Sequence, residues 1–113
     1  FRRVLFRSFE NLVVSERQKA YLNRGIEPTL VFYRDDSKRE IDLIDLTEPA
    51  RPQAFEIKSG ATYRDTFARH LRSVGSELGI PAKDRAVVYH GSERYDTEGA
   101  SVVPAEEFLL RES

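Results

Sequence analysis

Residues 39–46 read REIDLIDL and residues 53–58 read QAFEIK, and both runs alternate apolar with polar side chains. Alternation with a period of two is typical of half-buried β-strands. Pro49 and Pro52 interrupt the chain between the two runs, and proline is typical of a connecting loop. The two runs therefore predict consecutive antiparallel strands.

Charged side chains on these two strands are predicted to meet. In a regular strand residues i and i+2 share a face, which gives two sets in the first run: Glu40, Asp42 and Ile44 on one face, and Ile41, Leu43 and Asp45 on the other. In the second run Glu56 and Lys58 share a face. Antiparallel pairing then brings Asp42 beside Glu56 and Lys58. A charge placed among apolar neighbours opposes folding unless it is paired.

These residue types suit a divalent metal site. Asp42 and Glu56 offer hard oxygen ligands of the kind that Mg²⁺ prefers, and Glu10 would add a third carboxylate if the first helix packs near the strand ends. Lys58 would position or help to deprotonate a water molecule and offset charge on a phosphoryl group. The set is what metal-dependent phosphodiester hydrolysis requires, so we expect a Mg²⁺ site acting on DNA or RNA.

The rest of the chain predicts helices around a sheet. Apolar periodicity, turn residues and β-branched runs give these expected segments: helix 9–24, strand 29–34, turn 35–38, helix 64–78, strand 85–90, polar loop 91–99, strand 101–103 and helix 104–110. A three-strand meander followed by a helical crossover predicts an α/β fold. We expect a mixed central sheet of four or five strands flanked by helices.

Composition excludes several classes of protein. The chain has 113 residues, which is the size of one domain. It has no cysteine, and this excludes a disulfide scaffold and a thiol nucleophile. No apolar run is long enough for a membrane span or a signal peptide, so we expect a cytoplasmic protein. The net charge of -1 gives no overall attraction to nucleic acid.

The first eight residues are expected to be foreign to the domain. Residues 2–8 read RRVLFRS and resemble the translation of a widely used sequencing adapter. We therefore assign residues 1–8 to non-native sequence and residues 9–113 to the domain, as the C-terminal fragment of a longer protein. The sequence contains no Met, as a truncated gene would give. Leaving out the three arginines of this segment moves the net charge from -1 to -4.

Two resemblances follow from the motifs. Asp42, thirteen further residues and then Glu56-Ile57-Lys58 resemble the PD-(D/E)XK nuclease signature, although Ile41 stands where that signature has proline. An ordered set of segments resembles the C-terminal domain of unknown function of prokaryotic AAA+ ATPases: 9–11 (FEN), 32–35 (FYRD), 39–42 (REID), 55–60 (FEIKSG) and 88–91 (VYHG).

The resemblances imply a fold, a set of site residues and a partner. They imply a restriction-endonuclease-like fold, with Asp42 and Glu56 as metal ligands, Lys58 as the catalytic lysine and Glu10 as the helix carboxylate. They also imply an ATPase module upstream in the intact protein. The sequence given contains no P-loop motif.

Other interpretations stay open. Asp42, Glu56 and Lys58 would equally form cross-strand salt bridges in an interaction or regulatory module that does not cleave. Carboxylates that converge on one point favour the metal site, whereas carboxylates on different faces favour the module. A third alternative is a phosphate-binding domain without hydrolysis, which would place basic residues around the same pocket.

Further polar residues are not assigned to catalysis. Histidines 70 and 90 are interpreted as structural. Arg64, Arg69 and Arg72 would either contact phosphates or form a solvated helix face.

Overall fold

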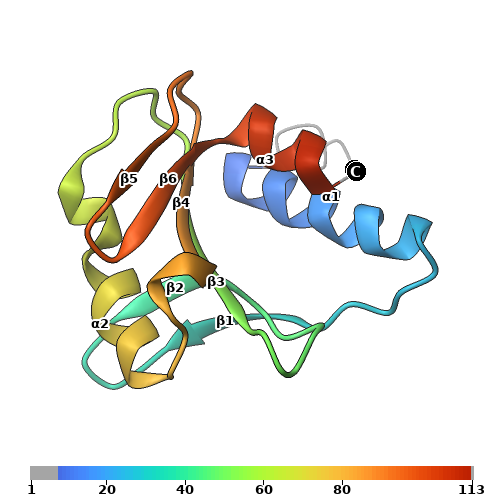
Figure 1. Cartoon of the computed structure of the whole chain (residues 1–113), viewed down its shortest axis with the longest axis horizontal. Helices are drawn as coiled ribbons and strands as arrows, with labels where there is room; N and C mark the ends of the chain where they lie inside the picture. The colour runs from blue at the N-terminus through green and yellow to red at the C-terminus, as the bar shows by residue number, and fades with distance from the viewer. Residues whose placement is uncertain (1–7, 113) are drawn as a thin grey trace.

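The computed structural model describes residues 8–112, and Figure 1 shows a sheet with helices on both sides. The elements are α1 (Phe9–Asn23), β1 (Leu30–Arg34), β2 (Glu40–Asp45), β3 (Gln53–Lys58), η2 (Asp65–Ala68), α2 (Arg69–Glu77), η3 (Ala82–Asp84), β4 (Arg85–Tyr89), β5 (Tyr95–Thr97), β6 (Ala100–Pro104) and α3 (Ala105–Glu112). Segments η2 and η3 are short 3-10 turns. Within the described residues no helix has both the length and the hydropathy needed to cross a bilayer.

The mixed α/β architecture predicted from the sequence is confirmed. The strands are ordered β1-β2-β3-β4-β6-β5. Strands β1, β2 and β3 form an antiparallel meander, β3, β4 and β6 run parallel, and β5 is antiparallel to β6. The sheet has six strands instead of the expected four or five, because the polar segment 95–97 pairs with the edge strand β6. This segment was expected to be part of a polar loop, because it is short and has no run of apolar residues.

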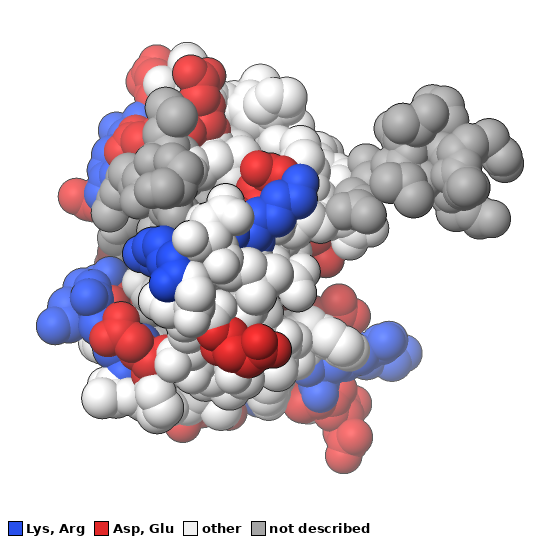
Figure 2. All heavy atoms as spheres, turned by 90° about the vertical axis from the view of Figure 1, so that its right-hand side faces the viewer, with Lys and Arg blue, Asp and Glu red and all other residues white. Residues whose placement is uncertain are grey.

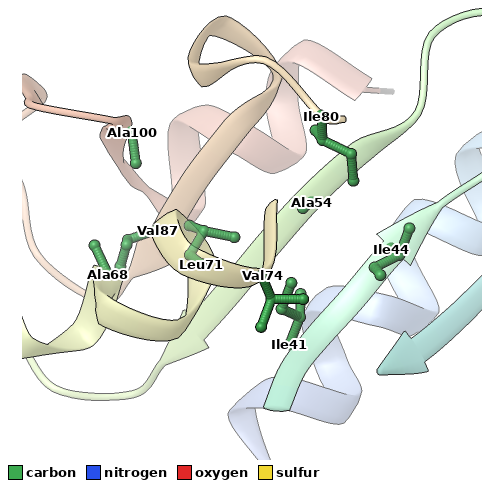
Figure 3. Packing of buried hydrophobic residues seen from close by; sticks show 9 residues of the cluster. All are labelled: Ile41, Ile44, Ala54, Ala68, Leu71, Val74, Ile80, Val87 and Ala100. Atoms are coloured by element: carbon green, nitrogen blue, oxygen red, sulfur yellow. The ribbon is translucent and has the colours of Figure 1, made fainter. Parts of the chain in front are cut away.

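Two apolar layers hold the helices on the sheet. On one face α2 packs on a cluster that Figure 3 shows from close by: Ile41, Ile44, Ala54, Ala68, Leu71, Val74, Ile80, Val87 and Ala100. On the other face α1 and α3 pack on a second cluster: Val13, Leu43, Phe55, Ile57, Val88, Val103, Ala105 and Phe108. Burial on both faces explains the continuous apolar run of β4. β3 is buried on both faces as well, although it carries Glu56.

A β-bulge changes the face that each residue of β2 presents. Val31 pairs with Ile44 and Tyr33 pairs with Ile41, so Phe32 alone lies opposite both Asp42 and Leu43. An extra residue in one strand breaks the two-residue alternation. Ile41 and Ile44 therefore lie in the same apolar cluster. The expected placement of Ile41 on the face of Leu43 and Asp45 is wrong for this reason.

A buried ion pair ties α1 to the sheet. The Nε of Arg17 donates to Oδ2 of Asp45 at 2.7 Å, and both side chains are only 2% exposed. A second guanidinium nitrogen donates to Oε1 of Gln53 at 2.9 Å, so one side chain contacts both β2 and β3. The guanidinium carbon also lies 4.8 Å from the ring centroid of Phe55. Hydrogen bonds and aromatic packing compensate for removing this arginine from water.

Replacing Arg17 with alanine is expected to destabilise the fold by about 3–5 kcal/mol, because Asp45 is left as an uncompensated buried charge. The control is Arg34→Ala, which removes a pair with Glu40 in which both side chains are more than half exposed. That change should cost less than about 1 kcal/mol. Urea unfolding of both variants measures the difference, and equal small losses would contradict the structural role of Arg17.

Candidate functional site

Strands β2 and β3 separate at Asp42 and Glu56. Their main-chain pairing covers Asp45, Ile44 and Leu43, and it ends at the pair of Leu43 with Phe55. Beyond this pair, side chains instead of backbone carbonyls accept the backbone N–H groups. Oε1 of Glu56 accepts from the backbone N–H of Asp42 at 2.9 Å. Oδ2 of Asp42 accepts from the backbone N–H of Ile57 at 2.8 Å. Each carboxylate thus satisfies a backbone donor at the point where the strands part.

The environment of Glu56 strongly disfavours its charge. The residue is 7% exposed, and burial, reinforced by the negative charge of Asp42, raises the pKa of Glu56 to about 8. Contact between the two carboxyl groups raises the pKa of Glu56 further, whereas the backbone hydrogen bond and Lys58 lower it. When two carboxyl groups share one site, the pKa of one of them is raised, because two adjacent negative charges repel each other.

Lys58 lies beside this pair without a close bond to it. Its Nζ is 3.9 Å from Oε2 of Glu56, and its side chain is 37% exposed. The ammonium group also lies 5.4 Å from the ring centroid of Phe67. A cation at this distance offsets part of the carboxylate charge and keeps its donors available.

Glu10 lies near the pair but outside it. Burial raises the pKa of Glu10 above its usual range, and the charge of Asp42 adds to this effect while that of Lys58 opposes it. Among residues 8–112 no group of three or more histidine, aspartate or glutamate side chains converges as a metal site. Glu10 as a third metal ligand therefore stays a prediction.

The two carboxyl groups meet between pockets on opposite sides of the sheet. Glu56 and Lys58 line a pocket of about 250 Å³ against η2 and α2. Asp42 and Glu10 line a different pocket, of about 260 Å³, between α1 and β1. The bulge accounts for this, because it shifts Asp42 out of the regular alternation of β2. Asp42 and Glu56 are neighbours, but they do not share one open face.

The donor set suits a hard cation. Oδ1 of Asp42 accepts no hydrogen bond from the described residues, and Oε2 of Glu56 faces only the distant Lys58 ammonium. Mg²⁺ is commonly held by one or two carboxylates while it keeps several waters. Two adjacent carboxyl groups with unused oxygens fit that requirement, provided that Glu56 gives up its proton. Metal binding by Asp42 and Glu56 stays a prediction.

Residues of η2 and α2 join the site. From the sequence, Arg69 was expected either to contact phosphate or to lie on a solvated face, His70 was interpreted as structural, and Thr66 and Phe67 were given no role. The pocket that contains Glu56 and Lys58 is completed by Thr66, Phe67, Arg69 and His70. The helical run 64–78 was visible in the sequence, but which of its polar residues face β3 depends on how α2 crosses the sheet.

The other histidine has a packing role. His90 stacks on Phe9 with ring centroids 5.0 Å apart. Its backbone N–H also donates to the carbonyl of Gly60. This environment agrees with the structural interpretation of His90.

The stability of the domain should depend on the ionisation of Glu56. The unfolded chain releases this proton near pH 4.5, whereas the folded chain holds it to about pH 8. Stability contributed by the protonated group is therefore complete below pH 4.5 and is lost as the pH rises through about 8. The loss is expected to be on the order of a few kcal/mol.

The measurement is urea unfolding in metal-free buffer across this pH range. Glu56→Gln keeps the acceptor for Asp42 and cannot ionise, so the variant should gain stability relative to the unmodified protein as the pH rises. The exposed Glu27, changed to Gln, is the control. Parallel pH curves for the unmodified protein and Glu56→Gln would disprove the raised pKa.

Comparison with known proteins identifies a family. A model described as Domain of unknown function (DUF4143) matches residues 7–108. Proteins of this family typically carry the domain at the C-terminus of AAA-type ATPases. No curated protein and no solved structure matches the chain. The resemblance to a domain of unknown function is thus confirmed, whereas the relation to PD-(D/E)XK nucleases stays a prediction. Because the match covers most of its length, the chain belongs to the DUF4143 family.

Proposed function

We propose that this domain is a nuclease-like module in which Asp42 and Glu56 hold Mg²⁺ and Lys58 positions water for phosphodiester hydrolysis of DNA or RNA. The observation that carries the proposal is the meeting of two carboxyl groups where β2 and β3 separate. Lys58 lies beside them with its ammonium group partly open to solvent.

The repulsion between the carboxylates of Asp42 and Glu56 supports a bound cation. A buried carboxyl group next to a second one, with a single lysine near, is unfavourable when both are ionised. A divalent cation held by Asp42 and Glu56 would offset that repulsion. It would also favour the ionised form of Glu56, because a carboxylate must lose its proton to bind metal.

The residues then have separate roles. A bound Mg²⁺ supplies Lewis acidity and lowers the pKa of coordinated water. Asp42 and Glu56 hold the ion, and their bonds to the backbone amides of Ile57 and Asp42 fix the orientation of both carboxyl groups. Lys58 offers ammonium donors to a water or a phosphoryl oxygen. Glu10, which lines the pocket beside Asp42, would add a third carboxylate to the metal site.

The family relationship suggests which module the domain would act beside. Since the family typically stands at the C-terminus of AAA-type ATPases, we propose that the domain acts beside an ATPase module of the same protein in the cytoplasm. ATP-driven movement of nucleic acid or of a protein partner would then deliver substrate to the site.

Two observations favour a non-catalytic alternative. Asp42 and Glu56 line pockets on opposite sides of the sheet and do not share one open face, which is the arrangement expected of an interaction module. Both carboxylates already accept backbone N–H groups that no strand pairing satisfies, so they stabilise the end of the sheet without any metal. In that case the domain would be an interaction or regulatory module of the ATPase, with Asp42 and Glu56 serving the fold alone.

Metal titration separates the two functions. Calorimetric titration with Mg²⁺ and Mn²⁺ should show binding at millimolar concentration or tighter. Asp42→Asn, which keeps the shape and an acceptor oxygen, should weaken binding by roughly tenfold or more. The control is Asp36→Asn, at an exposed position in the turn before β2. It should bind metal like the unmodified protein.

Cleavage is measured on supercoiled plasmid and on single-stranded RNA, with Mg²⁺ or with chelator. Lys58→Ala should lose cleavage and keep metal binding. Absence of both metal binding and cleavage in the unmodified protein would overturn the nuclease proposal in favour of the interaction module.

A further inference from the structure

The pocket on the α2 side of β3 carries basic groups whose use the metal site does not explain. We call it the α2-side pocket; it has a volume of about 250 Å³ and is lined by Glu56, Lys58, Thr66, Phe67, Arg69 and His70. Its residues come from a strand and from the turn and helix that follow it, so the fold holds them together over a short stretch of chain.

Two of its cationic side chains have N–H groups that make no hydrogen bond with the described residues. The ammonium of Lys58 lies 3.9 Å from the nearest carboxylate oxygen, which is beyond hydrogen-bond distance. Arg69 is exposed, and its side chain makes no hydrogen bond or ion pair with the described residues. Glu56 is the single acidic side chain in the lining, so the described pocket has an excess of positive groups.

His70 adds a neutral donor. Its Nδ1 accepts from the backbone N–H of Glu40 at 3.4 Å. A neutral imidazole that accepts at Nδ1 carries its proton on Nε2. No described residue accepts a hydrogen bond from Nε2 of His70. The pocket therefore combines ammonium, guanidinium and imidazole donors, which is the combination that binds phosphoryl oxygens.

The second pocket with basic lining is different. Three of its four arginines have a carboxylate partner: Arg17 with Asp45, Arg51 with Asp84, and Arg94 with Glu107. The fourth, Arg85, donates to the backbone carbonyls of Ile80 and Gly99, and Lys83 completes the basic lining. On the crossover helix Arg72 is likewise bound to Asp65. Acidic and basic side chains are also interspersed on the face of the molecule shown in Figure 2. With a net charge of -1, any attraction to a polyanion has to be local.

We propose that the α2-side pocket binds a backbone phosphate of nucleic acid through Lys58 and Arg69, with His70 as a third donor. As the place where a substrate phosphate is held, this site rests on the proposed function. The binding itself needs no metal ion, so it is tested separately.

The experiment is fluorescence anisotropy of a labelled single-stranded DNA and of the matching RNA, in chelator, over a series of salt concentrations. Arg69→Ala should weaken binding of both probes and reduce the slope of log K against log salt by about 1, as expected for one lost phosphate contact. Inorganic phosphate should compete with both probes for the unmodified protein. The exposed Arg64, changed to Ala, is the matched control, because it precedes η2 and does not line the pocket.

The outcomes distinguish this inference from the proposed function. Arg69→Gln, which removes the charge and keeps part of the side chain, should repeat the loss seen with alanine. Equal affinities and salt slopes for the Arg64 and Arg69 variants, or no binding by the unmodified protein, would overturn the phosphate site. Metal binding without phosphate binding would leave the metal site standing alone. Phosphate binding without metal binding or cleavage would refute the nuclease and keep the phosphate site.

Discussion

Two hydrogen bonds, from the backbone N–H of Asp42 to Glu56 and from the backbone N–H of Ile57 to Asp42, are the interaction on which this end of the molecule depends. Each carboxylate accepts a backbone N–H from the region of the other strand, where the pairing of β2 with β3 has stopped. Unsatisfied backbone donors are costly when buried, so the two side chains allow the strands to part at low cost. The separation gives access to the carboxyl groups from both sides of the sheet.

The layers on either side supply the rest of the site. On one side Arg17 fixes α1 against β2 and β3, and the start of that helix then brings Glu10 close to Asp42. On the other side the crossover through η2 and α2 places Arg69 and His70 over Glu56 and Lys58. Residues from five elements of the chain thus meet at one end of a short sheet, while the opposite end carries paired ions.

The sequence allowed the main elements and the central group of residues to be predicted. Periodicity marked α1, α2 and the strands β2 and β3, and the antiparallel order of the last two made Asp42 a neighbour of Glu56. Prediction failed where a feature depends on tertiary structure. The bulge opposite Phe32 arises from pairing with β1, and β5 forms because β6 offers it an edge. The burial of Arg17 was hidden, because an arginine on a polar helix is usually exposed.

The bulge also places a core residue and a site residue next to each other on β2. Phe32 lies opposite two residues, Asp42 and Leu43, and only Leu43 belongs to the apolar layers. A strand shortened by Asp42 alone would run regularly from Ile41 through Leu43 to Ile44, with both isoleucines still on the α2 face. The carboxylate is thus carried by an additional residue that the sheet does not require for its packing. Deletion of the codon for Asp42 would therefore keep the apolar layers and remove the side chain that accepts the backbone N–H of Ile57.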